Sequence, residues 1–180
     1  LVSHRAIQTE IDRFRYLPQV AGEDARIRAA LSRPEAPQAI EAANRYLERI
    51  TAQTGAEQLY LMDDSGLTLA ASNWSEPDSY VGHNYGFRPY FTEARDTGSG
   101  AVYAIGVTTG EPGYFISTRV DDPATGLSGV MVVKIDLRPI EKAWAETGQY
   151  IAVTDRDDVV FLSSQPDWRY RPLTPLPEDA

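Results

Sequence analysis

The chain contains no cysteine, which excludes disulfide bridges, thiolate metal ligands and cysteine nucleophiles. Only two of its 180 residues are histidines, His4 and His83. No apolar run approaches the roughly 20 residues of a membrane-spanning helix, and no signal-peptide pattern opens the chain. A G-x-S-x-G elbow, a P-loop, a dinucleotide fingerprint and an H-E-x-x-H motif are all missing. These absences disfavour an enzyme and favour a binding function.

Positive charge is also scarce. The formal net charge is −9 and the pI is near 4.7, which argues against nucleic acid and anionic lipid as partners. A net-negative protein that binds a small anion must use a local cationic site, so each arginine or lysine in an apolar context is informative. Hydrophobic residues make up 42% of the chain, enough for one good core or two small ones. The chain also lacks a starting Met, and we expect it to be a domain of a longer protein.

The first third of the chain is predicted to be helical. Ile7, Ile11 and Phe14 recur at helical spacing until Pro18, which we expect to end an amphipathic opening helix. Its narrow apolar stripe suits packing on a domain or on a second copy of itself. Two further helices are predicted, over residues 25–31 and 37–54.

From Glu57 the hydrophobic period changes to two, which predicts strands. The expected strands cover residues 59–62, 67–71, 101–107, 113–120 and 128–136. Two short helices are expected over residues 89–95 and 137–146.

The strand pattern then begins again. Residues 153–164 can be laid on residues 62–72, with Asp155 on Asp63 and Ser164 on Ser72. This similarity suggests two related α/β units in tandem. Chance likeness between two generic hairpins is the alternative. The acidic turns resemble fragments of calcium loops, but they lack the later Glu of an EF-hand and are better explained as hairpin turns.

A binding site is suggested by the aromatic segment over residues 71–90. It contains Tyr85, Tyr90 and one arginine, Arg88, whose planar fork suits a carboxylate. A second cation, Lys134, lies inside an apolar strand, where burial is costly unless it meets an anion. Hydroxyl and backbone donors that could complete a site for a short dianion come from Ser117 and the corner Thr108-Thr109-Gly110. The alternatives are a surface ion pair for Arg88 and a snorkelling edge position for Lys134.

Several of these motifs together resemble the sensor domain of C4-dicarboxylate sensor histidine kinases of the DctB type. The matching residues are 59–63, 71–74, 81–82, 84–85, 87–91, 112–114 and 132–134, with further likeness over residues 3–5, 12–18, 161–164 and 166–170. The resemblance therefore extends over nearly the whole chain, and residues 84–91 with Lys134 are its most specific part.

The resemblance implies an α+β, double-Cache fold: a long N-terminal helix followed by two PAS-like units with antiparallel sheets. It divides the chain into a helical stalk and linker (residues 1–56), a membrane-distal ligand-binding unit (57–147) and a membrane-proximal unit (148–180) that is expected to stop short of its natural end.

The resemblance also implies which residues bind the ligand. Tyr85 and Arg88 would hold one carboxylate of the ligand, and Lys134 would hold the other. Hydrogen bonds would come from Thr108, Thr109, Gly110 and Ser117, and Tyr90 and Tyr114 complete the set. One departure is that Thr118-Arg119-Val120 follows the serine strand where the family often has Pro-Val, so Arg119 could also face the pocket.

In function, the resemblance implies sensing of succinate, fumarate or malate in the periplasm by the ectodomain of an inner-membrane protein. The domain itself would be non-enzymatic and free of metals and cofactors, with ATP used only in the absent kinase region. Expected partners are a second copy through the N-terminal helix, flanking membrane helices and a cytoplasmic response regulator. The alternatives are a chemoreceptor or sensor for another small acid such as malonate or acetate, and a ligand-free dimerisation module.

Overall fold

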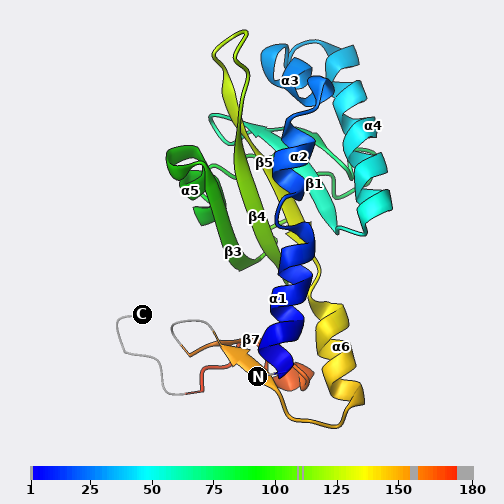
Figure 1. Cartoon of the computed structure of the whole chain (residues 1–180), viewed down its shortest axis with the longest axis vertical. Helices are drawn as coiled ribbons and strands as arrows, with labels where there is room; N and C mark the ends of the chain where they lie inside the picture. The colour runs from blue at the N-terminus through cyan, green and yellow to red at the C-terminus, as the bar shows by residue number, and fades with distance from the viewer. Residues whose placement is uncertain (1, 109, 111, 155–157, 174–180) are drawn as a thin grey trace. The chain divides into compact units, whose positions relative to one another are not determined.

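The structure is a computed structural model that describes residues 2–108, 110, 112–154 and 158–173 (Figure 1). Its contacts divide the chain into two units: Ile11–Asp136, and Leu1–Glu10 with Leu137–Ala180. In this grouping residues 11–56 fall with the first sheet and residues 1–10 with the smaller unit, whereas the sequence predicted residues 1–56 as a separate segment. No helix among the described residues is both long and apolar enough to cross a membrane.

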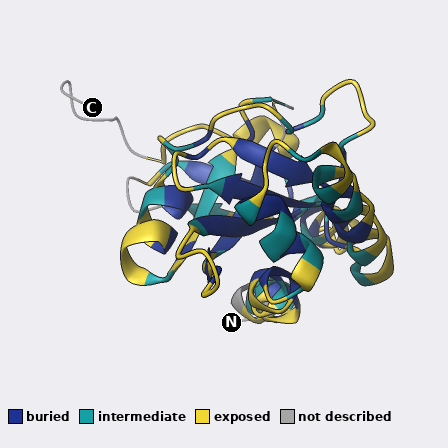
Figure 2. Ribbon diagram, turned by 90° about the horizontal axis from the view of Figure 1, so that it is seen from above, coloured by how far each residue is buried: buried dark blue, intermediate teal, exposed yellow. Residues whose placement is uncertain are grey.

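The larger unit contains a five-stranded antiparallel sheet. The strand order is β2-β1-β5-β4-β3. The bounds are β1 Gln58–Asp63, β2 Thr68–Ala71, β3 Ser99–Ile105, β4 Pro112–Asp121 and β5 Ser128–Ile135. The five predicted strands are therefore confirmed, with ends that shift by one or two residues. β1, β2, β4 and β5 are largely buried, β3 at the edge of the sheet is mostly half-buried or exposed, and the helices expose their outer faces (Figure 2).

The helices α2 (Leu17–Gly22), α4 (Pro37–Thr54) and α5 (Pro89–Thr97) pack against strands of this sheet. α2 packs on β4 and β5, α4 packs on β1 and β2, and α5 packs on β3, β4 and β5. α3 (Ala25–Ser32) contacts α4 and begins at Asp24, whose side chain accepts a hydrogen bond from the Arg26 N–H. β5 is central, and all its residues after Ser128 are buried. The middle of the sheet is therefore dry on both faces.

The prediction for Pro18 was wrong. The opening helix α1 (Val2–Phe14) already ends at Phe14, and Pro18 lies in the first turn of α2. The first turn tolerates proline because its N–H groups have no intrahelical partner there. The stop at Gly55, in contrast, is confirmed: Gly55 caps α4 in the left-handed region with φ 73°.

The smaller unit contains α6 (Arg138–Glu146), the hairpin β6 (Ala152–Thr154) and β7 (Val160–Ser163), and a 3₁₀ turn over Pro166–Trp168. The hairpin repeats the geometry of β1 and β2. Both hairpins have three residue pairs and an irregularity before the third pair. The pairs are Tyr60–Ala71, Leu61–Ala70 and Met62–Thr68 in the first, and Ala152–Ser163, Val153–Leu162 and Thr154–Val160 in the second. Asp155, the predicted counterpart of Asp63, lies outside the described residues.

The serines that directly follow the second strand of each hairpin, Ser72 and Ser164, also make equivalent contacts. Ser72 closes the first hairpin on Leu59: its N–H donates to the Leu59 carbonyl at 2.8 Å and its Oγ accepts from the Leu59 N–H at 3.0 Å. Ser164 does the same with Ile151, at 2.9 Å for both bonds. Shared pairing and shared closure support a tandem repeat over a chance likeness.

A helix supports each hairpin in the same way. Asn44 of α4 accepts a hydrogen bond from the Ala71 N–H at 2.9 Å, and Glu141 of α6 accepts one from the Ser163 N–H at 2.8 Å. Ala71 and Ser163 occupy the same position in the two hairpins. Each bond satisfies a buried backbone donor that would otherwise be left without an acceptor.

We expect Asn44→Ala to lower the free energy of unfolding by about 1–3 kcal/mol, because the Ala71 N–H would stay buried without an acceptor. Gln53→Ala, an amide truncation at an exposed position of the same helix, is the control and should change little. Urea unfolding followed by circular dichroism measures both. Equal effects of the two substitutions would contradict this role for Asn44.

Candidate ligand-binding site

One cavity in the larger unit brings together part of the predicted site. It is small: it encloses room for about one water molecule, and its empty space is about 230 Å³ when the open mouth is included. It is lined by Tyr60, Tyr80, Tyr85, Arg88, Tyr90, Gly106, Val107, Thr108 and Phe115. The lining comes from β1, β4, the segment over residues 72–88, the start of α5 and the loop after β3.

Aromatic rings form the walls of this cavity. Tyr60, Tyr80 and Tyr85 meet edge to face, with ring centroids 5.2–6.0 Å apart. Tyr90 and Phe115 stack at 5.0 Å. Such pairs add stability beyond their buried area and hold the rings in place. The cavity therefore has rigid apolar walls.

The segment that carries Tyr80 and Tyr85 is fixed to the β1–β2 turn. Gly66 and Gly86 touch there so closely that a Cβ on Gly66 would lie 2.3 Å from the Gly86 Cα. The Tyr85 N–H donates to the Gly66 carbonyl at 2.9 Å. Glycine at both positions is what allows the segment to bring Tyr85 against the sheet.

The tyrosine hydroxyls are neutral hydrogen-bonding groups. The Tyr60 hydroxyl donates to the Tyr90 hydroxyl at 2.8 Å, and the Tyr85 hydroxyl lies 2.5 Å from Thr108 Oγ1. Burial raises the pKa of Tyr90 to about 12 and raises the pKa of Tyr60 well above its usual value. Burial also raises the pKa of Tyr85. Near neutral pH these groups keep their protons. Because Tyr60 donates to Tyr90, the hydroxyls that can still donate to an anion are that of Tyr90 and that of one member of the Tyr85–Thr108 pair.

Arg88 supplies the positive charge of the cavity. It immediately precedes α5, is half-buried, and donates from Nη2 to the Ile105 carbonyl at 2.5 Å. Arg88 lines the cavity together with Tyr85 and Tyr90, and its charge acts to lower the pKa of both tyrosines against the larger effect of burial. Within the described part of the chain Arg88 forms no ion pair, so a surface ion pair does not explain it.

Lys134 lies on the same face of the sheet but does not line the cavity. It pairs across strands with Phe115 and Gln58, and Val132, two residues earlier, pairs with Tyr60. Directly opposed residues point to one face, so Lys134 shares the face of Phe115 and Tyr60. Its side chain is 0% exposed, and Nζ lies 2.6 Å from Glu57 Oε1. The alternative of a snorkelling edge residue was wrong, because β5 is central and Lys134 is fully buried.

Three other predicted site residues lie away from the cavity. Ser117 is fully buried, and its Oγ contacts the carbonyls of Tyr90 at 2.7 Å and Gly100 at 3.1 Å, which joins α5 to the sheet. Strand alternation places Tyr114 on the face opposite Phe115. Gly110 is exposed with φ 69°, and its N–H donates to the Gly106 carbonyl at 2.7 Å, inside the loop after β3. The prediction for Thr109 lies outside the described residues.

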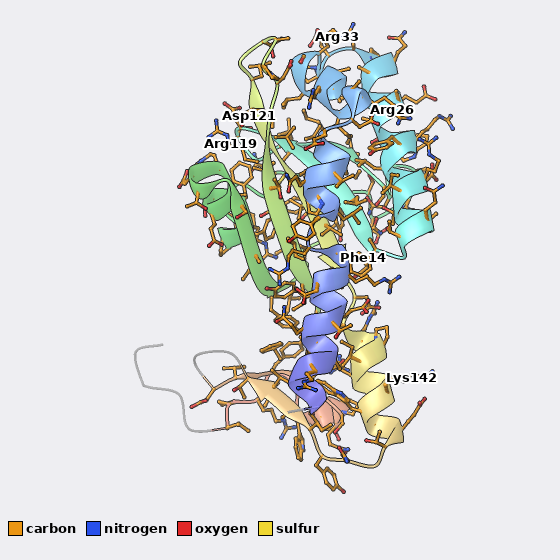
Figure 3. The ribbon with its side chains drawn as sticks, viewed as in Figure 1. Phe14, Arg26, Arg33, Arg119, Asp121 and Lys142 are labelled. Atoms are coloured by element: carbon orange, nitrogen blue, oxygen red, sulfur yellow. The ribbon has the colours of Figure 1, made fainter. Side chains whose placement is uncertain are left out.

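Arg119 does not line the cavity either. Its Nε lies 2.8 Å from Asp121 Oδ1, and both side chains are largely exposed near the end of β4 (Figure 3). The possibility that it alters the pocket is therefore not supported. The cavity residues outside the predicted set are Tyr60, Phe115, Tyr80, Gly106 and Val107. Period-two alternation of β1 and β4 was the available signal for the first two, and Tyr80 lies in the aromatic segment over residues 71–90.

Metal binding has no support in the part of the chain that the structure describes, where no cluster of three or more His, Asp or Glu side chains could hold an ion. The site offers one arginine, neutral hydroxyls and aromatic walls. This chemistry suits a small organic anion, and among the described residues that line the cavity no nucleophile lies beside a base.

Comparison with protein-family models gives no match. The chain is 40% identical over 173 residues to the C4-dicarboxylate transport sensor protein DctB of Rhizobium meliloti, covering 96% of this chain and 28% of that protein. It is 38% identical over 164 residues to the Pseudomonas aeruginosa protein of the same name, covering 91% of this chain and 27% of that protein. The chain thus spans under a third of the length of these curated relatives.

Comparison with solved structures also finds a DctB sensor domain. The sensor domain of the Vibrio cholerae histidine kinase DctB matches with a TM-score of 0.93 and 34% identity, over 98% of this chain and 68% of that one. The ligand-binding domain of the Campylobacter jejuni chemoreceptor Tlp3, with 4-methylisoleucine, matches with a TM-score of 0.73 over 97% of this chain and 69% of that one. Its 14% identity shows the fold alone.

The fold and its cavity define a ligand-binding sensor domain of the double-Cache class, which confirms the predicted α+β architecture. The chain belongs to the family of DctB-type sensor domains of C4-dicarboxylate sensor histidine kinases.

The raised pKa of Tyr90 predicts a loss of stability at high pH. The unfolded tyrosine ionises near pH 10, whereas the folded one does so at about 12, so the unfolded state releases its proton first. The stability due to Tyr90 is complete below pH 10 and declines as the pH rises towards 12. We expect the difference in unfolding free energy between wild type and Tyr90→Phe to shrink over this range. A constant difference from pH 8 to 11.5 in urea unfolding would contradict the assignment.

Proposed function

We propose that this domain binds a C4-dicarboxylate such as succinate, fumarate or malate in the cavity beside Arg88, as the extracytoplasmic sensor of a two-component histidine kinase. The observation that carries the proposal is Arg88, a cation without a carboxylate partner among the described residues, beside two neutral tyrosine hydroxyls. The likeness to relatives named as C4-dicarboxylate transport sensors supports the choice of ligand class.

The first carboxylate of the ligand would contact Arg88. The guanidinium presents parallel N–H groups to a carboxylate, and such charge-assisted pairs are stronger than neutral hydrogen bonds. Tyr85, Tyr90 and Thr108 offer hydroxyl groups next to it. This half of the site alone would accept a monocarboxylate.

The second carboxylate would contact Lys134. Phe115 lines the cavity and pairs directly with Lys134 on the neighbouring strand, so the two cations lie towards one face of the same sheet. A dianion that reaches both would be favoured over a monoanion by the additional charge. The selectivity for a dicarboxylate therefore depends on access to Lys134.

For the whole protein, the proposal places the domain in the periplasm, between membrane helices, as a non-catalytic part of a kinase. ATP and the response regulator would bind the kinase region. Ligand would shift an equilibrium between two arrangements of a dimer that forms through the N-terminal helix. A difference of about 1–3 kcal/mol in ligand affinity between the arrangements would suffice to change output.

We expect succinate at 100 times its Kd to stabilise the domain by about 2.7 kcal/mol, measured as a shift in thermal unfolding. Arg88→Ala should weaken binding by about 10- to 100-fold, because it removes a charge-assisted contact worth about 1.5–3 kcal/mol. Arg95→Ala is the matched control, since Arg95 lies on α5, the helix that Arg88 directly precedes, and pairs with Asp96 at the surface.

Two results would contradict the proposal. One is the absence of stabilisation by any C4 diacid. The other is an undiminished effect of succinate on Arg88→Ala, provided that circular dichroism shows the variant to be folded.

A further inference from the structure

Lys134, the second cation of the proposed site, already forms an ion pair with Glu57. Lys134 Nζ lies 2.6 Å from Glu57 Oε1, and the Glu57 N–H donates to the Lys134 carbonyl at 3.0 Å. Glu57 stands directly before β1, where the β1–β5 register pairs Gln58 with Lys134. Backbone pairing therefore holds the Glu57 carboxylate beside the buried ammonium.

The charges of this pair constrain how a ligand can bind. A second carboxylate brought to the same ammonium would lie beside the Glu57 carboxylate, which is 2.6 Å from Lys134 Nζ. Two carboxylates that share one site repel each other, and this repulsion is strong where the groups are buried. A dicarboxylate that uses Lys134 must therefore displace the Glu57 carboxylate or bind against its repulsion.

Glu57 is the member of the pair that can move. Its side chain is 18% exposed, whereas that of Lys134 is 0% exposed. Glu57 Oε2 is buried in this state, so the carboxylate reaches water once its partly exposed side chain turns outward, whereas the ammonium cannot leave the sheet without exposing the strand. The asymmetry in exposure favours exchange of one carboxylate for another around a fixed Lys134.

We propose that Glu57 is an internal competitor for the second carboxylate of the ligand, and that it sets the affinity for dicarboxylates relative to monocarboxylates. This inference rests on the proposed function. A monoacid needs only the Arg88 half of the site and leaves the Lys134–Glu57 pair intact. A diacid must replace Glu57, so Glu57 lowers diacid affinity and makes the unliganded state more stable.

The test is isothermal titration of succinate and of butyrate, the monoacid of the same length, into wild type, Glu57→Gln and Glu41→Gln. Glu41 is the matched control, because it is an exposed carboxylate on α4 that pairs with Arg45. We expect Glu57→Gln to bind succinate about tenfold or more tightly than wild type, with butyrate affinity unchanged. Glu41→Gln should resemble wild type for both ligands.

Succinate binding by Glu57→Gln that equals or falls below that of wild type would overturn the inference, since it would show that Glu57 helps Lys134 hold the ligand. If wild type itself binds no diacid, the proposed function fails and the inference fails with it. If Glu57→Gln does not fold, the same titrations on Glu57→Asp provide the test. Its shorter carboxylate should hold Lys134 less well and bind succinate more tightly than wild type, and unchanged or weaker binding would overturn the inference.

Discussion

A fully buried ammonium group in the middle strand of the sheet is the constraint on which the site depends. β5 is covered on both faces, so Lys134 cannot reach water and must have an anion close by. The β1–β5 register places Glu57 beside it, and the pair is joined through both side chains and backbone. Any anion that binds next to Lys134 must therefore displace the Glu57 carboxylate or bind beside its negative charge.

The other half of the site has the opposite character. Arg88 has no carboxylate partner in the described chain, and its surroundings are tyrosine hydroxyls and backbone carbonyl groups. Burial keeps Tyr60 and Tyr90 protonated, so they do not add negative charge next to the guanidinium. An incoming anion thus meets an available cation at Arg88 and an occupied one at Lys134. Under the proposed function, this difference would give the two carboxylates of a diacid separate roles: one would bind Arg88, and the other would compete with Glu57 for Lys134.

The spacing of apolar residues and the position of a glycine predicted most of the helices and strands, because these elements depend on residues that are close together in the sequence. Period-two alternation located the five strands, and Gly55 marked the end of α4. The Pro18 prediction failed because a proline is compatible with the first turn of a new helix, and the spacing of apolar residues does not show where one helix ends and the next begins.

The candidate site was predicted only in part. Arg88, Tyr85, Tyr90 and Thr108 do line the cavity, and alternation correctly placed Lys134 in a buried strand. The partner of Lys134 could not be predicted, since Glu57 is 77 residues away and becomes a neighbour only through the β1–β5 register. Ser117 was chosen for its hydroxyl, but that hydroxyl joins α5 to the sheet, a use that only tertiary packing reveals.

The most direct measurement is a crystal structure of the domain with succinate. We expect one carboxylate of succinate on the Arg88 guanidinium and the other on Lys134 Nζ, with Glu57 Oε1 moved from its 2.6 Å contact with that nitrogen. Succinate bound elsewhere, or bound at Arg88 with the Lys134–Glu57 pair intact and the second carboxylate remote from Lys134, would contradict this expectation.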